Sequence, residues 1–124
     1  MKLALRLPSI PESIPVARHV LDRLEGSLSA PMIEDLRLLV SEIVTNSIRH
    51  GPAEQVIELR VRVDRHVVRV EVDDGGPGFE PPTYAARSER DAGWGLMLVD
   101  RLADRWGVSS GRMTTVWFEI DRPA

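Results

Sequence analysis

Two neighbouring segments alternate apolar and charged residues so regularly that they constrain the fold. Residues 55–63 and 67–73 place valine, isoleucine or leucine at every second position, with mostly charged residues between them. A period of two is typical of β-strands with one buried face. The three-residue link at 64–66 is short enough to join the strands as an antiparallel hairpin. The sequence therefore predicts a sheet that is covered on one face and exposed to water on the other.

Three other segments have the periodicity of amphipathic helices. One helix is predicted over residues 12–26, and a longer one from an N-cap at Ser29 to a stop at Gly51. A third is predicted from about Gly95 to Trp106. The apolar stripe predicted for the first helix consists of Val16, Val20, Leu21 and Leu24. All three helices have one apolar face, so we expect them to pack on the sheet.

Further strands are predicted at residues 2–7 and in a final hairpin formed by 107–109 and 114–120. The resulting order of strands and helices lacks the regular alternation of a parallel sheet. We therefore expect an α+β fold: a two-layer sandwich with three helices on one face of a mixed, mainly antiparallel sheet. A chain of 124 residues is the size of one domain, so residues 1–124 are expected to fold as a single unit.

Composition excludes several classes of protein. The chain has no cysteine, which rules out disulfides and cysteine-based zinc sites. No stretch is long and apolar enough to cross a bilayer, and the N-terminal segment has no signal-peptide core. The formal net charge of −3 argues against binding to nucleic acid or to an anionic membrane. We therefore expect a soluble cytoplasmic protein.

A carboxylate and a carboxamide lie one turn apart on the long predicted helix. Glu42 and Asn46 are four residues apart, so their side chains share one side of the helix. Such a pair can hold a hydrated cation and orient a water molecule or a hydroxyl. Taken alone, the same pattern is more often a solvated polar face of an amphipathic helix.

A glycine-rich segment follows the predicted hairpin. It begins with Asp73 and Asp74 and includes Gly76 and Gly78. A carboxylate at this strand end could accept a hydrogen bond from an amino group such as that of adenine, and the glycines would let the backbone approach a flat ring. Consecutive strand residues point to opposite faces, so only one aspartate can do this, and spacing does not decide which. A plain Gly/Pro turn is an equally good reading of this motif alone.

The third helix opens with glycines at 93 and 95. The free N–H groups and the dipole at such a helix start can bind an anion, although a simple loop-to-helix junction has the same sequence. The segment lacks the pattern of a Walker-type phosphate loop.

Together, in this order, these features resemble the ATPase superfamily that includes gyrase, heat-shock chaperones, histidine kinases and mismatch-repair proteins. Its nucleotide-binding domain, the Bergerat fold, is an α/β sandwich. The resemblance covers residues 3–120 and is greatest to the small anti-sigma-factor serine kinases of bacteria, in particular to actinobacterial members. It implies that ATP and Mg²⁺ are the ligands.

The resemblance also implies a role for individual residues. Glu42 would be the general base or the water-orienting group near the γ-phosphate, Asn46 would coordinate Mg²⁺, and Asp74 would accept a hydrogen bond from the adenine amine. Arg18 matches an arginine that the family uses to contact protein partners, although an ordinary exposed arginine fits equally well. The other residues expected to contact the nucleotide are Gly76, Gly78, Gly93, Gly95, Leu96 and Thr114.

The function implied by the resemblance is that of a regulatory protein serine/threonine kinase. It would sequester a sigma factor and phosphorylate an anti-sigma antagonist protein. A catalytically silent ATP-binding module that acts by docking alone is the main alternative. A detached ATPase domain of a histidine kinase is disfavoured, because no dimerisation helix precedes residue 12 and the segment 80–92 is short for a lid. The sequence leaves homodimer formation open.

Overall fold

The computed structural model describes residues 1–52, 54–74, 93–111 and 113–123. Its described strands form one five-stranded sheet in the order β1-β2-β3-β5-β4. All four strand pairings are antiparallel. The strands are β1 (Lys2–Pro8), β2 (Val56–Val63), β3 (Val67–Asp74), β4 (Arg105–Ser110) and β5 (Thr114–Asp121). The predicted hairpins at 55–73 and 107–120 are confirmed.

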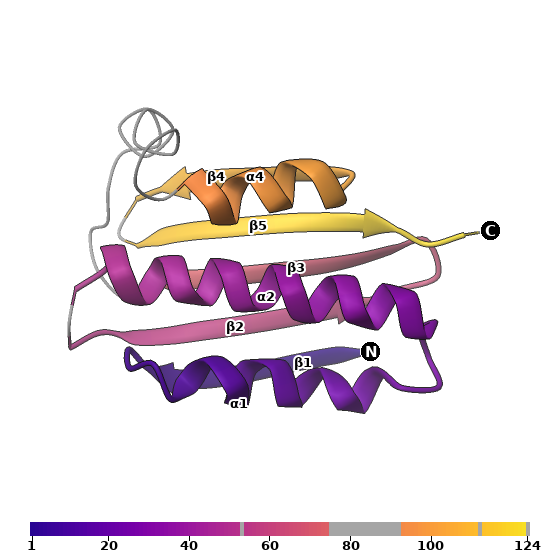
Figure 1. The fold of residues 1–124 in the computed structure, drawn as a ribbon, viewed down its shortest axis with the longest axis horizontal. Helices are drawn as coiled ribbons and strands as arrows, with labels where there is room; N and C mark the ends of the chain where they lie inside the picture. The colour runs from indigo at the N-terminus through magenta and orange to yellow at the C-terminus, as the bar shows by residue number, and fades with distance from the viewer. Residues whose placement is uncertain (53, 75–92, 112, 124) are drawn as a thin grey trace.

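The described helices lie together on one face of this sheet, as Figure 1 shows. They are α1 (Ser13–Val20), which continues into the short 3₁₀ helix η1 (Leu21–Leu24), then α2 (Ala30–His50) and α4 (Gly93–Leu102). The hydroxyl of Ser29 accepts a hydrogen bond from the Met32 amide at 3.3 Å, which confirms the predicted N-cap of α2. The predicted two-layer α+β sandwich is therefore confirmed.

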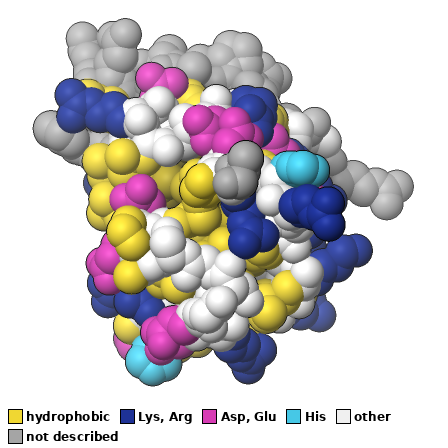
Figure 2. Space-filling view, turned by 90° about the vertical axis from the view of Figure 1, so that its right-hand side faces the viewer, with side chains coloured by type: hydrophobic (Ala, Val, Ile, Leu, Met, Phe, Trp, Pro, Cys, Tyr) yellow, Lys and Arg dark blue, Asp and Glu magenta, His cyan; other side chains and the backbone are white. Residues whose placement is uncertain are grey.

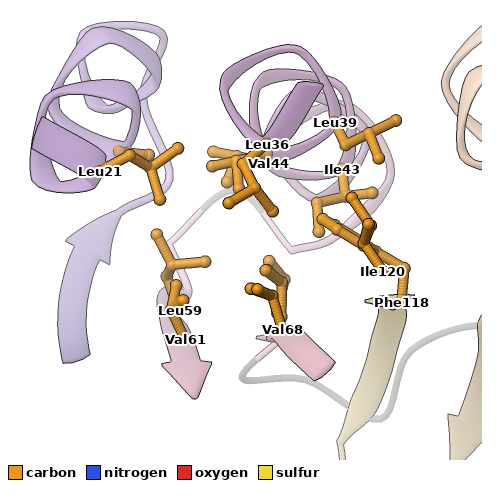
Figure 3. Close-up of a cluster of buried hydrophobic side chains, with 14 of the residues drawn as sticks. Leu21, Leu36, Leu39, Ile43, Val44, Leu59, Val61, Val68, Phe118 and Ile120 are labelled. Atoms are coloured by element: carbon orange, nitrogen blue, oxygen red, sulfur yellow. The ribbon is translucent and has the colours of Figure 1, made fainter. Parts of the chain in front are cut away.

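The hydrophobic core fills the space between α2 and the three central strands. Side chains from α2 point down onto those of β2, β3 and β5, as Figure 3 shows. Each strand contributes every second residue, and each of these residues is almost completely buried. The largest buried side chains include Leu21, Leu36, Leu39, Ile43, Leu59 and Phe118. Burying such a side chain contributes roughly 1.5–3 kcal/mol, so this layer holds α2 firmly over the sheet.

Two details of the prediction were wrong. Val16 is 48% exposed, because α1 turns Ala17 rather than Val16 toward the sheet. Trp106 does not belong to the third helix: α4 ends at Leu102, and Trp106 lies on β4. Its indole N–H donates to the Asp100 carboxylate at 2.9 Å, back across the turn to α4. An apolar residue that fits both a helical and a strand period is ambiguous in sequence, and here strand pairing with β5 decides.

The other face of the sheet carries a layer of charged side chains in place of helices. Arg69 bonds to Glu71 at 2.9 Å and to Glu119 at 3.0 Å, and its guanidinium lies 4.3 Å from the ring centre of Trp117. The Trp117 indole in turn lies over Gly107, where a Cβ atom would come within 2.9 Å of the ring nitrogen. We call this charged surface the open face. It confirms the prediction that one face of the sheet is polar.

Acidic and basic side chains are interspersed on the end of the molecule that Figure 2 shows. That surface is not the continuous basic stripe typical of a nucleic-acid-binding protein. Within the described part of the chain, no helix is long and apolar enough to cross a membrane.

Candidate functional site

Three buried polar side chains lie where β3 ends beneath the C-terminal half of α2. Asp74 is the last residue of β3 and is 1% exposed. Thr114 begins β5, is directly opposite Asp74 in the strand register, and is fully buried. Asn46 lies on the buried side of α2 and is 7% exposed. Ser47 on α2 lies close enough to Asp74 for its side chain to lower the pKa of that carboxyl by hydrogen bonding.

Each of these three side chains has a buried atom with no hydrogen-bond partner among the described residues. The atoms are Nδ2 of Asn46, Oδ1 of Asp74 and Oγ1 of Thr114. Leaving a buried polar atom without a partner costs about 1–3 kcal/mol, so native proteins rarely contain such atoms without a reason. Three of them on adjoining elements indicate a site whose hydrogen bonds are completed by a ligand.

The electrostatic state of Asp74 is unusual for an aspartate. Burial raises the pKa of Asp74 to about 6, against the opposing effect of the Ser47 hydrogen bond. The negative charge of Asp73 raises this pKa further. Near neutral pH the Asp74 carboxyl is therefore mostly ionised but poorly solvated. It is a strong acceptor for an N–H donor that enters the site.

The structure also decides which of the two consecutive aspartates faces the site. Asp73 points to the open face, where Arg60 donates to it at 2.7 Å and Thr115 at 2.7 Å. Arg60 also bonds to Glu58 and Glu71, and its pKa is raised above the usual range by Asp73 first and by these two carboxylates in addition. Asp73 is thus fully engaged in a network of ion pairs, and Asp74 alone points toward α2.

Glu42 lies one turn before Asn46 on α2 and is partly exposed. It lines a groove between α1 and α2, and Arg18 lines the same groove from α1. Arg37 and Ser41 complete the α2 side of this groove near Glu42. The sequence singled out Glu42 and Arg18 separately, and the structure brings them to one surface.

The remaining predicted site residues lie at or before the start of α4. Gly93 and Gly95 fall in the first turn of α4, so the helix begins two residues earlier than predicted. Leu96 is buried and packs against Trp106 and Val108. Gly76 and Gly78 lie outside the described residues, as does the segment 80–92 that was considered as a lid.

No group of three or more His, Cys, Asp or Glu side chains that could hold a metal ion occurs among the described residues. In proteins Mg²⁺ usually keeps several water molecules and binds one or two protein side chains together with substrate phosphates. Asn46 provides a side chain of the right chemistry for that role, because its amide oxygen can coordinate a hard cation.

Comparison with known proteins identifies the family. Residues 7–120 match the histidine kinase-like ATPase domain. The chain belongs to the histidine kinase-like ATPase family. Serine-protein kinases RsbW from Listeria innocua and Listeria monocytogenes are each 30% identical to this ATPase-family chain over 119 residues, which cover 83% of it and 76% of theirs. The sensor protein QseC of Escherichia coli is 31% identical over 84 residues, 60% of this chain and 18% of QseC.

A solved structure confirms the fold of this chain. The crystal structure of the RsbU and RsbW domains of a Mycobacterium tuberculosis protein superposes with a TM-score of 0.70 at 22% sequence identity. The superposition covers 100% of this chain and 34% of the other, so the present chain corresponds to about a third of that chain.

Sequence reasoning missed Ser47, whose side chain favours the ionised form of the Asp74 carboxyl by hydrogen bonding. A signal was present in the sequence. Ser47 follows Asn46 and continues the apolar stripe of Ile43 and Val44, where a serine would otherwise be buried without a partner. A polar residue inside an apolar stripe indicates that another polar group lies opposite it.

Proposed function

We propose that this histidine kinase-like ATPase binds ATP with Mg²⁺ and transfers the γ-phosphoryl group to a serine or threonine of a protein antagonist. We further propose that it binds a sigma factor, which would place it in the cytoplasm. The observation that carries the proposal is the set of three buried, incompletely bonded polar atoms on α2, β3 and β5. The likeness to RsbW serine-protein kinases over most of the chain supports the choice of reaction.

Asp74 and Thr114 would hold the adenine. The free oxygen of the Asp74 carboxylate is an acceptor for the exocyclic amine, and Ser47 fixes the orientation of that carboxylate. The Thr114 hydroxyl can donate or accept, and it lies on the strand next to Asp74. Adenine would therefore complete the hydrogen bonds of both side chains. Gly76 and Gly78 are proposed to line the face of the ring.

Asn46, Glu42 and the start of α4 would hold the phosphate end. The Asn46 amide oxygen would hold a magnesium ion, which would supply positive charge to offset that of the phosphates. The free backbone N–H groups at the start of α4, from Gly93 to Leu96, would donate to phosphate oxygens. The Leu96 side chain is packed in the core, so its contribution would come from the backbone.

Glu42 would act on the incoming hydroxyl. Its partly exposed carboxylate can accept the serine proton while the serine oxygen bonds to the γ-phosphorus and the bond to the leaving ADP oxygen breaks. The substrate protein must then reach the groove between α1 and α2. Arg18 lines that groove and has an exposed guanidinium, so it is placed to bind the partner that delivers the hydroxyl.

Phosphate transfer from labelled ATP to candidate antagonist proteins tests this proposal. The wild-type protein should transfer label only when Mg²⁺ is present. Asn46→Ala should abolish transfer and keep the wild-type circular dichroism spectrum. Thr45→Ala is the matched control, because Thr45 adjoins Asn46 on α2 and its hydroxyl bonds only to the Ser41 carbonyl among the described residues.

The outcomes separate the two functions that the sequence left open. Wild-type transfer by Asn46→Ala would overturn the role of Asn46 in metal binding. Tight ATP binding with no label on any antagonist would instead support the module that acts by docking alone.

A further inference from the structure

Three basic side chains lie side by side across the open face of the sheet, on the side away from the proposed nucleotide site. In the strand register Lys2 of β1 is directly opposite Arg62 of β2, and Arg62 is directly opposite Arg69 of β3. Like charges at directly opposed positions on one face of a sheet destabilise the pairing. The fold thus keeps an unfavourable row of positive charge that a single neutral residue at position 62 would relieve.

Carboxylates neutralise only part of this row. Arg69 is bound to Glu71 and Glu119. The side chains of Lys2 and Arg62 make no ion pair or hydrogen bond within the described part of the chain. Asp64 is the acidic side chain on the neighbouring turn. Its carboxylate accepts from the amides of His66 and Val67 at 2.8 and 2.9 Å, and these bonds, with a weaker contribution from the charge of Arg62, lower its pKa.

The same residues surround a hollow in the open face. It is lined by Lys2, Arg60, Arg62 and Arg69, with Glu71 as its one acidic side chain. Glu71 is already shared between Arg60 and Arg69. The hollow therefore has unbalanced positive charge on the side formed by β1 and β2. A carboxylate would fit there, because it could accept two hydrogen bonds from the Arg62 guanidinium and a third from the Lys2 ammonium group.

We propose that Lys2, Arg62 and Arg69 form a docking site for an acidic segment of a partner protein. Carboxylate groups of that segment would lie in the hollow and separate the opposed cations. A free monovalent anion would gain little at such an exposed position, whereas a segment with several carboxylates gains from each contact. Nucleic acid is disfavoured because Glu71, Glu119 and Asp121 border the row on the open face, so the basic residues form a short patch and not the continuous stripe that a phosphate backbone requires.

This site does not depend on the proposed kinase activity, because it lies on the opposite face of the sheet from Asn46 and Asp74. A partner docked on the open face would leave the groove between α1 and α2 accessible. One molecule could therefore contact two proteins or two parts of one protein at the same time.

Titration of the ¹⁵N-labelled full chain with a Glu-rich synthetic peptide tests the proposal, with the Gln-rich peptide of the same length as its control. We expect amide shifts confined to β1, β2 and β3, and none with the Gln-rich peptide. Arg62→Glu should weaken the affinity for the Glu-rich peptide at least tenfold. Arg23→Glu on η1 is the matched control, because it changes the net charge equally at an exposed position of the helix layer and should retain wild-type affinity.

A second measurement does not depend on the choice of peptide. Arg62→Glu would replace two repulsive cross-strand contacts with attractive ones, and should raise the thermal midpoint of unfolding by about 2 °C. No peptide shifts on β1–β3, or equal loss of affinity in Arg62→Glu and Arg23→Glu, would overturn the proposal. So would binding of a DNA oligonucleotide or anionic vesicles that depends on Arg62 while the Glu-rich peptide does not bind. ATP binding should be the same in all of these variants, so failure here is distinct from failure of the proposed function.

Discussion

Two consecutive aspartates end β3, and their carboxylates lie on opposite faces of the sheet in different environments. Asp73 lies on the open face with both of its oxygens bonded, to Arg60 and Thr115. Asp74 lies under α2 with one oxygen bonded to nothing in the described residues and with a raised pKa. The same side chain, one residue apart, is structural where its charge is matched and available for a ligand where it is not. Both carboxylates are buried, so burial alone does not distinguish the structural aspartate from the one that is available for a ligand. The difference is that all the oxygens of Asp73 have hydrogen-bond partners and one oxygen of Asp74 has none among the described residues.

The largest expected difference between the two aspartates is in nucleotide binding. Asp74→Asn should weaken ATP binding by about 10- to 100-fold, because one charged hydrogen bond of roughly 1.5–3 kcal/mol is lost. Asp73→Asn should change the affinity less than about twofold, since its side chain faces away from the site. Isothermal titration calorimetry with Mg²⁺ measures both. Equal losses of ATP affinity in the two variants would contradict the proposal that only Asp74 faces the nucleotide.

The second difference is in stability without nucleotide, and here the effects have opposite signs. A carboxyl whose pKa is raised in the folded state stabilises the fold while protonated, and that contribution is lost as the pH rises from about 4 through about 6. Asp74→Asn removes this titration, and should raise the free energy of unfolding at pH 8 by about 2 kcal/mol. The gain should shrink as the pH falls toward 4.

Asp73→Asn should instead lower the free energy of unfolding by about 1 kcal/mol, a modest figure because the Arg60 partner is partly exposed to water. Urea unfolding at several pH values distinguishes the two variants. A nucleotide-free Asp74→Asn protein that is less stable than wild type at pH 8 would contradict the view that this carboxylate is strained without its ligand.

A third expectation concerns the pH dependence of binding. An amine donor favours the ionised carboxylate, so the affinity for ATP should fall as the pH drops below about 6, and binding near pH 6 should release a proton from Asp74. Calorimetry in buffers of different ionisation enthalpy detects that proton. Asp74→Asn is the control, because its profile retains only the titration of ATP itself. Identical pH profiles of ATP affinity for the wild-type protein and Asp74→Asn would show that Asp74 does not contact the nucleotide.

The smallest expected effect comes from Ser47. Ser47→Ala removes the hydrogen bond that favours the ionised form of Asp74, so the Asp74 pKa should rise above about 6. ATP binding at pH 7 should weaken by about threefold through this indirect route. Ser41→Ala is the matched control on the same helix, where the hydroxyl bonds to the Arg37 carbonyl instead. If both serine variants keep wild-type affinity at pH 6 and pH 8, Ser47 has no role in positioning Asp74.

Much of the fold could be read from the sequence because its signals are local. Alternation defines β2 and β3, and a serine cap with a terminal glycine marks both ends of α2. The positions of Trp106 and Val16 were predicted wrongly for a common reason. Each residue is apolar, and its spacing from the neighbouring apolar residues does not show which tertiary contact it makes. Pairing with β5 places Trp106 on a strand, and the packing of Ala17 in the core leaves Val16 on the exposed side of α1.

The residues proposed for the site could be named from the sequence, whereas their arrangement in space could not. Glu42, Asn46 and Asp74 could be singled out by type and spacing, but the face of the sheet on which each aspartate lies depends on strand register. Ser47 and Asp74 are distant in the chain, so the local pattern indicates that a polar group faces Ser47 but does not identify that group as Asp74. The shared groove of Glu42 and Arg18 likewise follows from how α1 packs against α2.

The indole of Trp117, held between Gly107 and the Arg69 guanidinium, gives the protein an intrinsic fluorescent reporter on the open face. Its emission depends on the charge stacked against it, so an event that draws Arg69 away should change the spectrum without any attached dye. With Trp94 and Trp106 replaced by phenylalanine, that signal would come from this surface alone, and occupancy of the sheet could be followed in real time.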